Sequence, residues 1–153
     1  MTGLKLSGFK EMELVLRQLP TATAKRTADR AIKAALAPVA AAANGMLPKG
    51  MPPVIVEKRL NKNQAKQFRG VEGETVRVMF VGSPSPRAHL EEFGTGPRFQ
   101  KSGKYTGIMR ARPFMRPAWD ATKQQVLERL RVDLAREIEK TVGRIAKKAA
   151  KGK

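Results

Sequence analysis

Residues 111–120, Ala-Arg-Pro-Phe-Met-Arg-Pro-Ala-Trp-Asp, decide how the two halves of this chain are joined. A proline holds the backbone dihedral φ at about −65° and has no N–H to donate. Pro113 and Pro117 therefore restrict the backbone where an extended segment meets a long helix. Three large apolar side chains are expected to anchor the joint in the core: Phe114, Met115 and Trp119. We interpret the stretch as a structural elbow that sets the angle of the helix after it.

Two arginines of this elbow are candidates for ion pairs. Arg112 and Arg116 could each pair with a nearby carboxylate. The expected partners are Glu91, Glu92 and Asp120. Such pairs would hold the elbow to its neighbours and would not by themselves create a chemical site.

Downstream of the elbow, the chain is predicted to form one long helix from Pro117 to about Ala149. Lys and Arg dominate its last turns, which complements the helix dipole. At about 1.5 Å per residue it would be about 45 Å long. A domain of this size cannot easily cover that length, so the end is expected to reach a neighbour or fray. The apolar stripe of the helix has helical spacing and consists of Val126, Leu127, Leu130, Leu134, Ile138, Val142 and Ile145.

Upstream, residues 1–46 are predicted to be helical. Residues 8–19 have apolar residues at helical spacing, and Pro20 ends that helix or starts the next one. The second helix runs to about Ala43, with a kink expected at Pro38 and a stop at Asn44-Gly45. Its stripe is built from small residues that permit close approach of another element: Ala28, Ala31, Ile32, Ala35, Leu36 and Val39.

Residues 47–116 combine short strands with two stretches predicted to be flexible loops. Strands are expected at 54–56 and, with clear alternation, at 74–82; a short helix follows at about 86–93. The basic, glycine-containing stretches at about 57–73 and 96–110 lack a periodic pattern, apart from a brief strand at 108–109. The sum is a single α+β domain, residues 1–153, in which a small antiparallel sheet packs with the N-terminal helices and the long C-terminal helix.

The composition argues against most enzyme classes. The chain has no cysteine and only one histidine, His89, so disulfides and thiolate metal sites are excluded. We expect no cofactor, no metal and no catalysis. The longest weakly polar stretch, residues 34–43, is too short to span a bilayer. Thirty-one Lys and Arg against thirteen Asp and Glu give a net charge of +18, spread along the whole chain. Such a charge attracts polyanions or acidic protein faces.

Three local motifs have a chemical and a structural interpretation. On a helix, His89 and Glu92 share a face and could act as an acid–base pair, but no nucleophile accompanies them, and a structural hydrogen bond is favoured. The sequence Gly94-Thr95-Gly96 lacks the third glycine and the lysine of phosphate loops, and it favours a helix end. The few aromatic residues do not alternate with basic ones, so base-specific nucleic-acid recognition is not indicated.

Two segments, read together, resemble the paired signature of a siphophage protein family. The first is Ala88-His89-Leu90-Glu91-Glu92-Phe93-Gly94-Thr95, and the second is the elbow at 111–120, with a variable basic loop between them. The family comprises the head–tail joining, tail-completion or neck proteins of lambdoid and related long-tailed phages. The Gly-Phe start, the Leu-Pro break and the alanine-rich helix are similar too. The matching signature positions are His89, Leu90, Glu92, Phe93, Gly94, Thr95, Arg112, Pro113, Phe114, Arg116, Pro117 and Trp119.

The resemblance implies a structural role in the virion, without catalysis or cofactor. The protein would form a homo-oligomeric ring, expected to be a hexamer, that completes the tail and joins it to the head connector. Its partners would be head-closure, tail-tube or tail-terminator proteins. It would be assembled in the cytoplasm of the host bacterium and would end in the neck of the particle, with DNA passing through the ring and no membrane contact.

The charge leaves a second function open, that of a sequence-independent nucleic-acid-binding protein. A basic lumen or surface would attract phosphates without reading bases. An enzyme built on His89 is the third and least favoured alternative. The basic residues expected to face DNA or a partner lie in the two predicted loops: Lys58, Arg59, Lys62, Lys66, Arg69, Arg98, Lys101 and Lys104.

Overall fold

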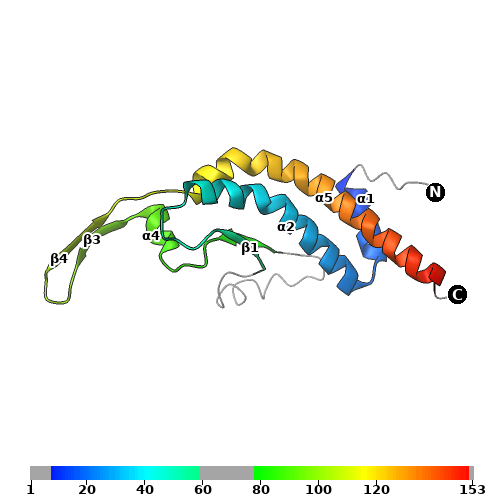
Figure 1. The fold of residues 1–153 in the computed structure, drawn as a ribbon, viewed down its shortest axis with the longest axis horizontal. Helices are drawn as coiled ribbons and strands as arrows, with labels where there is room; N and C mark the ends of the chain where they lie inside the picture. Colours follow the sequence, from blue (N-terminus) through cyan, green and yellow to red (C-terminus); the bar gives the residue numbers. More distant parts are fainter. Residues whose placement is uncertain (1–7, 59–77, 152–153) are drawn as a thin grey trace.

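Two long helices form the body of the molecule, and a β-hairpin projects from one end of it (Figure 1). The computed structural model describes residues 8–58 and 78–151. The elements are α1 (Phe9–Gln18), α2 (Thr21–Met46), β1 (Ile55–Glu57), β2 (Phe80–Gly82), α4 (Ala88–Phe93), β3 (Thr95–Phe99), β4 (Tyr105–Met109) and α5 (Met115–Lys151). The predicted α+β class and the long C-terminal helix are confirmed.

α2 and α5 pack along most of their length, and small side chains make this possible. The buried ridge of α2 has a spacing of four residues: Ala31, Ala35, Val39 and Ala43. Rows of residues four apart are the ridges by which helices interdigitate, and small members let the two backbones approach closely. The buried apolar residues of α5 are Ala118, Val126 and Ile138, and Ala118 packs in a cluster with Ala43 of the ridge. Pro38 lies inside α2 without ending it.

A buried hydroxyl pair, which the apolar pattern does not reveal, marks the far end of this helix pair. Thr27 Oγ1 lies 3.0 Å from Thr141 Oγ1. Each hydroxyl also lies within hydrogen-bonding distance of the carbonyl four residues before it, Thr23 O at 2.9 Å and Glu137 O at 2.7 Å. Two protons serve these three contacts, so one hydroxyl donates across the interface while the other donates within its own helix. The pair joins the start of α2 to α5 near residue 141.

The chain after α2 is attached to the body through Asn44. The Asn44 Nδ2 donates to the carbonyl of Val54 (3.0 Å), and its Oδ1 accepts the N–H of the same residue (2.7 Å). These two hydrogen bonds hold β1 next to α2. Val54 then joins the apolar cluster that Ala43, Phe114 and Ala118 form where the two long helices begin to pack.

The strands form two separate antiparallel ribbons, where the sequence predicted a single small sheet. β1 pairs with β2, with Ile55 opposite Gly82 and Glu57 opposite Phe80. β3 pairs with β4, with Thr95 opposite Met109 and Phe99 opposite Tyr105. Of the strand predicted at 74–82, the described residues are 78–82, and only Phe80–Gly82 (β2) are paired, so the prediction was wrong at 78–79. Positions 74–77 lie outside the described residues, as do positions 59–73 of the first predicted loop.

The prediction of a second loop at 96–110 was wrong, because these residues form most of the β3–β4 hairpin. Its turn is closed by the N–H of Gln100 on the carbonyl of Lys104 (2.8 Å) and by the N–H of Gly103 on the carbonyl of Gln100 (2.9 Å). Gly103 has a φ of +78°, which suits glycine. The residues on both faces of the hairpin strands are at least partly exposed. Without a buried face, no apolar alternation is needed, and the usual signal of a strand is missing.

Candidate functional site

The two segments that carry the family resemblance meet in space. α4 and the residues after it, 88–95, lie against the elbow at 111–116, where α5 begins. The hairpin β3–β4 leaves from this joint and returns to it, and α5 runs away in the opposite direction (Figure 1). The joint therefore positions the two longest projections of the molecule relative to each other.

The carboxylate of Glu92 caps the N-terminus of α5. Its Oε2 accepts the backbone N–H of Phe114 (2.8 Å) and of Met115 (2.9 Å), and its Oε1 accepts the N–H of Arg116 (3.0 Å). The first N–H groups of a helix have no partner within the helix, and a negative charge there is favoured by the helix dipole. Pro117 follows in the first turn, where a missing N–H costs nothing. A side chain from α4 thus completes the start of another helix.

The same contacts determine the protonation of Glu92. Burial by itself raises the pKa of this carboxyl. The three backbone donors, from Met115, Phe114 and Arg116, together with the positive charge of Arg116, outweigh burial and hold the pKa below its ordinary value of 4.5. Glu92 is therefore a carboxylate at neutral pH, as its capping role requires.

Gly94 is the residue at which the backbone of α4 touches the returning strand. Its φ is +72°, a conformation that L side chains rarely adopt. A Cβ at this position would lie 2.7 Å from the carbonyl oxygen of Met109 and 2.8 Å from the N of Ala111. Both neighbours are backbone atoms, so they cannot rotate away. The next residue, Thr95, accepts the N–H of Met109 at its Oγ1 (3.1 Å), which closes the base of the hairpin.

The remaining residues of α4 bind the elbow mainly through the backbone. The carbonyl of Glu91 accepts the N–H of Arg112 at 2.6 Å, while the carbonyl of Leu90 accepts the N–H of Gly94 at 2.8 Å and ends α4 itself. Glu91 is buried, and its Oε2 has no hydrogen-bond partner. Within residues 8–58 and 78–151, no ion pair joins Arg112 or Arg116 to the acids predicted for them; Asp120 pairs with Lys123 at 3.3 Å.

The predicted core anchors of the elbow are only partly buried. Phe114 has no exposed surface and Met115 is half-buried, but Trp119 is 47% exposed, so its predicted role as a core anchor was wrong. Trp119 is one residue past the buried Ala118, and on a helix this single step turns its side chain away from α2. Phe93 is 69% exposed at the end of α4.

A groove of about 460 Å³ opens beside this exposed Phe93. It lies between α4, the elbow and the first turns of α5, and its lining combines apolar residues with two acids and one base. The lining residues are Glu92, Phe93, Ala111, Pro113, Arg116, Pro117 and Asp120. Glu92 is engaged by three backbone donors and Asp120 by Lys123, so both carboxylates that line the groove already have partners.

His89 is exposed on α4, and the predicted hydrogen bond to Glu92 is not formed, because the carboxylate of Glu92 is used by α5. In the described part of the chain, no group of three or more His, Asp or Glu side chains is placed to hold a metal ion. No helix there has both the length and the apolar character needed to cross a membrane.

The basic residues predicted to face DNA or a partner fall into three groups. Arg98, Lys101 and Lys104 are exposed on the hairpin. Lys58 forms an ion pair with Asp29 at 2.7 Å, so its charge is already compensated. The positions Arg59, Lys62, Lys66 and Arg69 lie outside the described residues.

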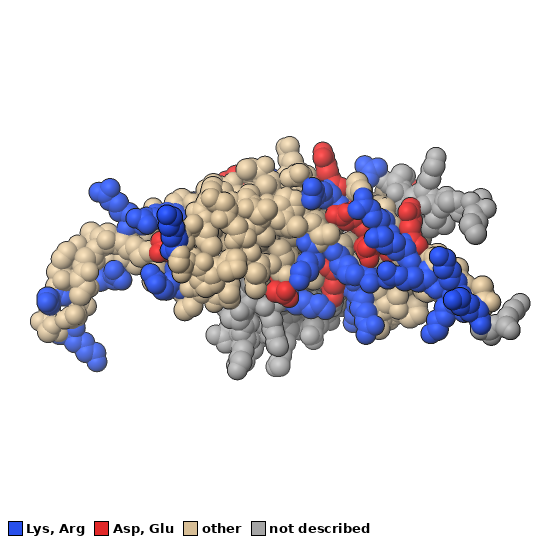
Figure 2. All heavy atoms as spheres, in the orientation of Figure 1, with Lys and Arg blue, Asp and Glu red and all other residues tan. Residues whose placement is uncertain are grey.

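A further basic cluster, at the end of α5, was not among the predicted site residues. No acid follows Glu139 in the sequence, and the exposed residues Arg144, Lys147, Lys148 and Lys151 come after it. Figure 2 shows positive side chains gathered over this half of α5 and, more sparsely, on the hairpin, with a mostly uncharged surface between. The signal was present in the sequence as an acid-free run at the end of a helix.

Comparison of this chain with protein-family models, with curated proteins and with solved structures finds no match.

Proposed function

We propose that this protein is a structural component of the neck of a long-tailed phage. In this role it forms a ring that completes the tail and joins it to the head connector, while DNA passes through. The protein is assembled in the bacterial cytoplasm and ends in the virion. Its role involves no catalysis.

The observation that carries the proposal is the joint between α4 and α5. The residues of the paired signature are in contact: Glu92 caps α5, and Gly94 touches the backbone at 109–111. Together they fix the directions of a hairpin arm and of a 37-residue helix whose last turns extend beyond the part that is packed. A ring subunit needs such extensions, because it must contact neighbours on both sides and proteins above and below it.

The test is inactivation of the gene in the phage that encodes it. We expect full heads and finished tails that remain unjoined in electron micrographs, and we expect joining to return when the intact protein is supplied from a plasmid. A supplied Glu92→Ala variant should restore joining poorly, whereas Glu13→Gln, a change in an exposed ion pair on α1, should restore it fully. Normal infectious particles from the inactivated phage would refute the proposal.

The acid-free end of α5 favours a second candidate, sequence-independent binding of nucleic acid. Four exposed cations within two turns of helix form a surface that attracts phosphates without reading bases. A duplex-binding titration at several salt concentrations tests this candidate. Tight binding by the isolated monomer, with a steep loss of affinity as salt rises, would favour it as the primary function over a role that depends on assembly.

A further inference from the structure

The hairpin arm carries apolar side chains that nothing in the described part of the molecule covers. Phe99 is 64% exposed and Tyr105 is 53% exposed, and their rings lie 5.4 Å apart, centroid to centroid. Ile108 on the same hairpin is also exposed. Exposed aromatic residues on a projecting element typically mark a contact surface.

The arm is also purely basic. Residues 95–109 contain Arg98, Lys101 and Lys104 and no acid. Its natural partner is therefore a surface that offers apolar area together with uncompensated carboxylates. Such surfaces are scarce in the described part of the chain, because six of its acids already form an ion pair with a base.

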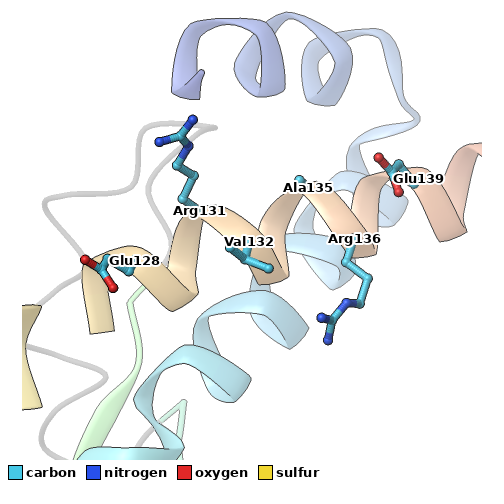
Figure 3. A pocket seen from close by; sticks show the side chains of 6 residues that line it. All are labelled: Glu128, Arg131, Val132, Ala135, Arg136 and Glu139. Carbon is cyan, nitrogen blue, oxygen red and sulfur yellow. The ribbon is translucent and has the colours of Figure 1, made fainter. Parts of the chain in front are cut away.

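One face of α5 has these properties (Figure 3). A groove of about 700 Å³ lies along Glu128, Val132, Ala135 and Glu139, with Arg131 and Arg136 also on its walls. Val132 is 55% exposed. Among the exposed carboxylates of the described residues, Glu128 and Glu139 are the two without an ion pair or another polar partner.

The two arginines on the walls of this groove are compatible with binding of the basic arm. Arg136 forms an ion pair with Asp133 at 3.5 Å, so its charge is partly compensated. Arg131 is a guanidinium beside the groove, and guanidinium groups pack favourably over the faces of aromatic rings such as those of Phe99 and Tyr105. The groove thus offers a complement to both the charges and the rings of the arm.

The dimensions fit as well. Glu128 and Glu139 are separated by about 16 Å along the helix, at about 1.5 Å per residue. A five-residue strand such as β3 has a similar length, about 16 Å at about 3.3 Å per residue. The arm cannot reach the groove of its own chain, because it leaves the joint in the direction opposite to α5 (Figure 1). The partner must be another molecule.

The geometry points to docking of the arm of one copy onto the Glu128–Glu139 face of α5 in the next copy. Lys101 and Lys104, with Arg98, lie against the two carboxylates, and the Phe99 and Tyr105 rings cover Val132 and Ala135. The two surfaces differ, so every docked subunit still offers a free arm or a free groove. Repetition of such a contact closes into a ring when the rotation allows it. This inference rests on the proposed ring and names the contact that builds it.

Disulfide trapping tests the contact directly, since the chain has no cysteine of its own. A full-length chain carrying both Tyr105→Cys and Val132→Cys should form a ladder of disulfide-linked oligomers under mild oxidation. The matched control carries Tyr105→Cys and Leu14→Cys, because Leu14 is slightly more exposed than Val132 but lies on α1. Trapping no faster than in the control, at any protein concentration up to the solubility limit, would overturn the inference.

Charge exchange gives a second, independent test by light scattering. Variant A carries Lys101→Glu and Lys104→Glu, and variant B carries Glu128→Lys and Glu139→Lys. Each alone should associate at least 10-fold more weakly than the wild type. An equal mixture should also associate, since the arm of each variant then meets a groove of opposite charge on the other. All four changes in one chain should restore assembly, and failure of that rescue would contradict the contact.

The outcomes separate this inference from the proposed function. Rings that form without the trapped disulfide would remove the arm-to-groove contact and leave the neck role standing. A trapped ladder in a protein whose gene is dispensable for joining would keep the contact and remove the neck role.

Discussion

Glu92 connects the chemistry of one residue to the geometry of the whole molecule. Its carboxylate satisfies three N–H groups at the start of α5 from a position 22 residues earlier in the chain. A helix is ordinarily capped by a neighbour in sequence. Here the cap comes from another element, so forming the helix start and docking α4 are one event.

Loss of this cap should destabilise the fold. Glu92→Ala leaves three buried or half-buried N–H groups without an acceptor, and we expect the free energy of unfolding to fall by about 2 to 3 kcal/mol. Glu92→Gln keeps one acceptor oxygen and should cost less. Urea unfolding at pH 7 measures both. The control Glu13→Gln removes an exposed ion pair and should stay within about 0.5 kcal/mol. Equal effects of Glu92→Ala and the control would refute the capping role.

The stabilisation by Glu92 should depend on pH in a defined direction. The pKa of Glu92 is lowered in the folded protein, so the charged form stabilises the fold. This contribution is fully present above the ordinary pKa of 4.5 that the group has in the unfolded chain, and it is lost as pH falls through the lower folded value. The difference in unfolding free energy between the wild type and Glu92→Gln should therefore be constant from pH 7 to about pH 5.5 and shrink below about pH 4. A difference that grows with acidification would contradict it.

Gly94 is constrained by both its dihedral angle and its neighbours. Gly94→Ala places a methyl group 2.7 Å from the Met109 oxygen at a φ of +72°, and we expect destabilisation of at least about 2 kcal/mol. Gly96→Ala, two residues along, is the matched control, because a Cβ there meets nothing within 4 Å. Thermal unfolding of the two variants provides the comparison. Similar melting temperatures for both would show that the joint can relax.

At the scale of elements, the β3–β4 hairpin and α5 behave differently. α5 is covered by α2 from Ala118 to about Thr141, where the hydroxyl pair with Thr27 closes the interface. Beyond it, the last turns are exposed, as expected from the length of the helix. The hairpin is attached to the body at its base, through Gly94 and the Thr95–Met109 contact. One element is therefore part of the core, and the other is an appendage.

The appendage should be removable without unfolding the body. Replacing residues 97–107 with a short Gly-Ser link keeps Gly94, Thr95 and Met109. The unfolding free energy should change by less than about 1 kcal/mol, because the arm buries no apolar surface against the two long helices. Phe114→Ala, which opens a cavity at a fully buried position, should by comparison cost about 3 to 5 kcal/mol. A large loss of stability in the shortened chain would show that the arm supports the body.

At the scale of the whole molecule, charge is distributed toward the two ends. The arm and the last turns of α5 are basic, while the middle of the body is largely uncharged on the face in Figure 2. Among the described residues, seven ion pairs with an exposed base compensate acids between Glu13 and Glu137. The uncompensated positive charge therefore lies where the molecule would meet a neighbour or nucleic acid.

The two basic ends should differ in their effect on nucleic-acid binding. Substituting glutamine for Arg144, Lys147, Lys148 and Lys151 should lower duplex affinity at all sequences. The slope of log affinity against log salt should become shallower by roughly three to four, at about 0.9 per phosphate contact. The same change at Arg98, Lys101 and Lys104 should act less on duplex binding and more on self-association. Equal loss of duplex binding from both ends would argue against separate roles.

The sequence by itself determined the helices, the α+β class and the elbow. These features depend on local chemistry: apolar residues at helical spacing in 8–19, 21–43 and 117–149, and prolines that restrict φ at 113 and 117. Helix periodicity survives in the sequence because one face of each helix is buried in the same core. The predicted bounds accordingly lie within a few residues of α1, α2 and α5.

Only the tertiary structure decided the joint and the arm. The capping of α5 by Glu92 and the exposure of Trp119 depend on how α4 and α2 lie against α5, which no local pattern contains. The same holds for the Thr27–Thr141 pair. Apart from a brief strand at 108–109, the hairpin at 95–109 was not predicted, because both its faces are exposed and its strands need backbone pairing but no apolar alternation. Neither contacts between distant segments nor strands without a buried face produce a periodic pattern of apolar residues in the sequence.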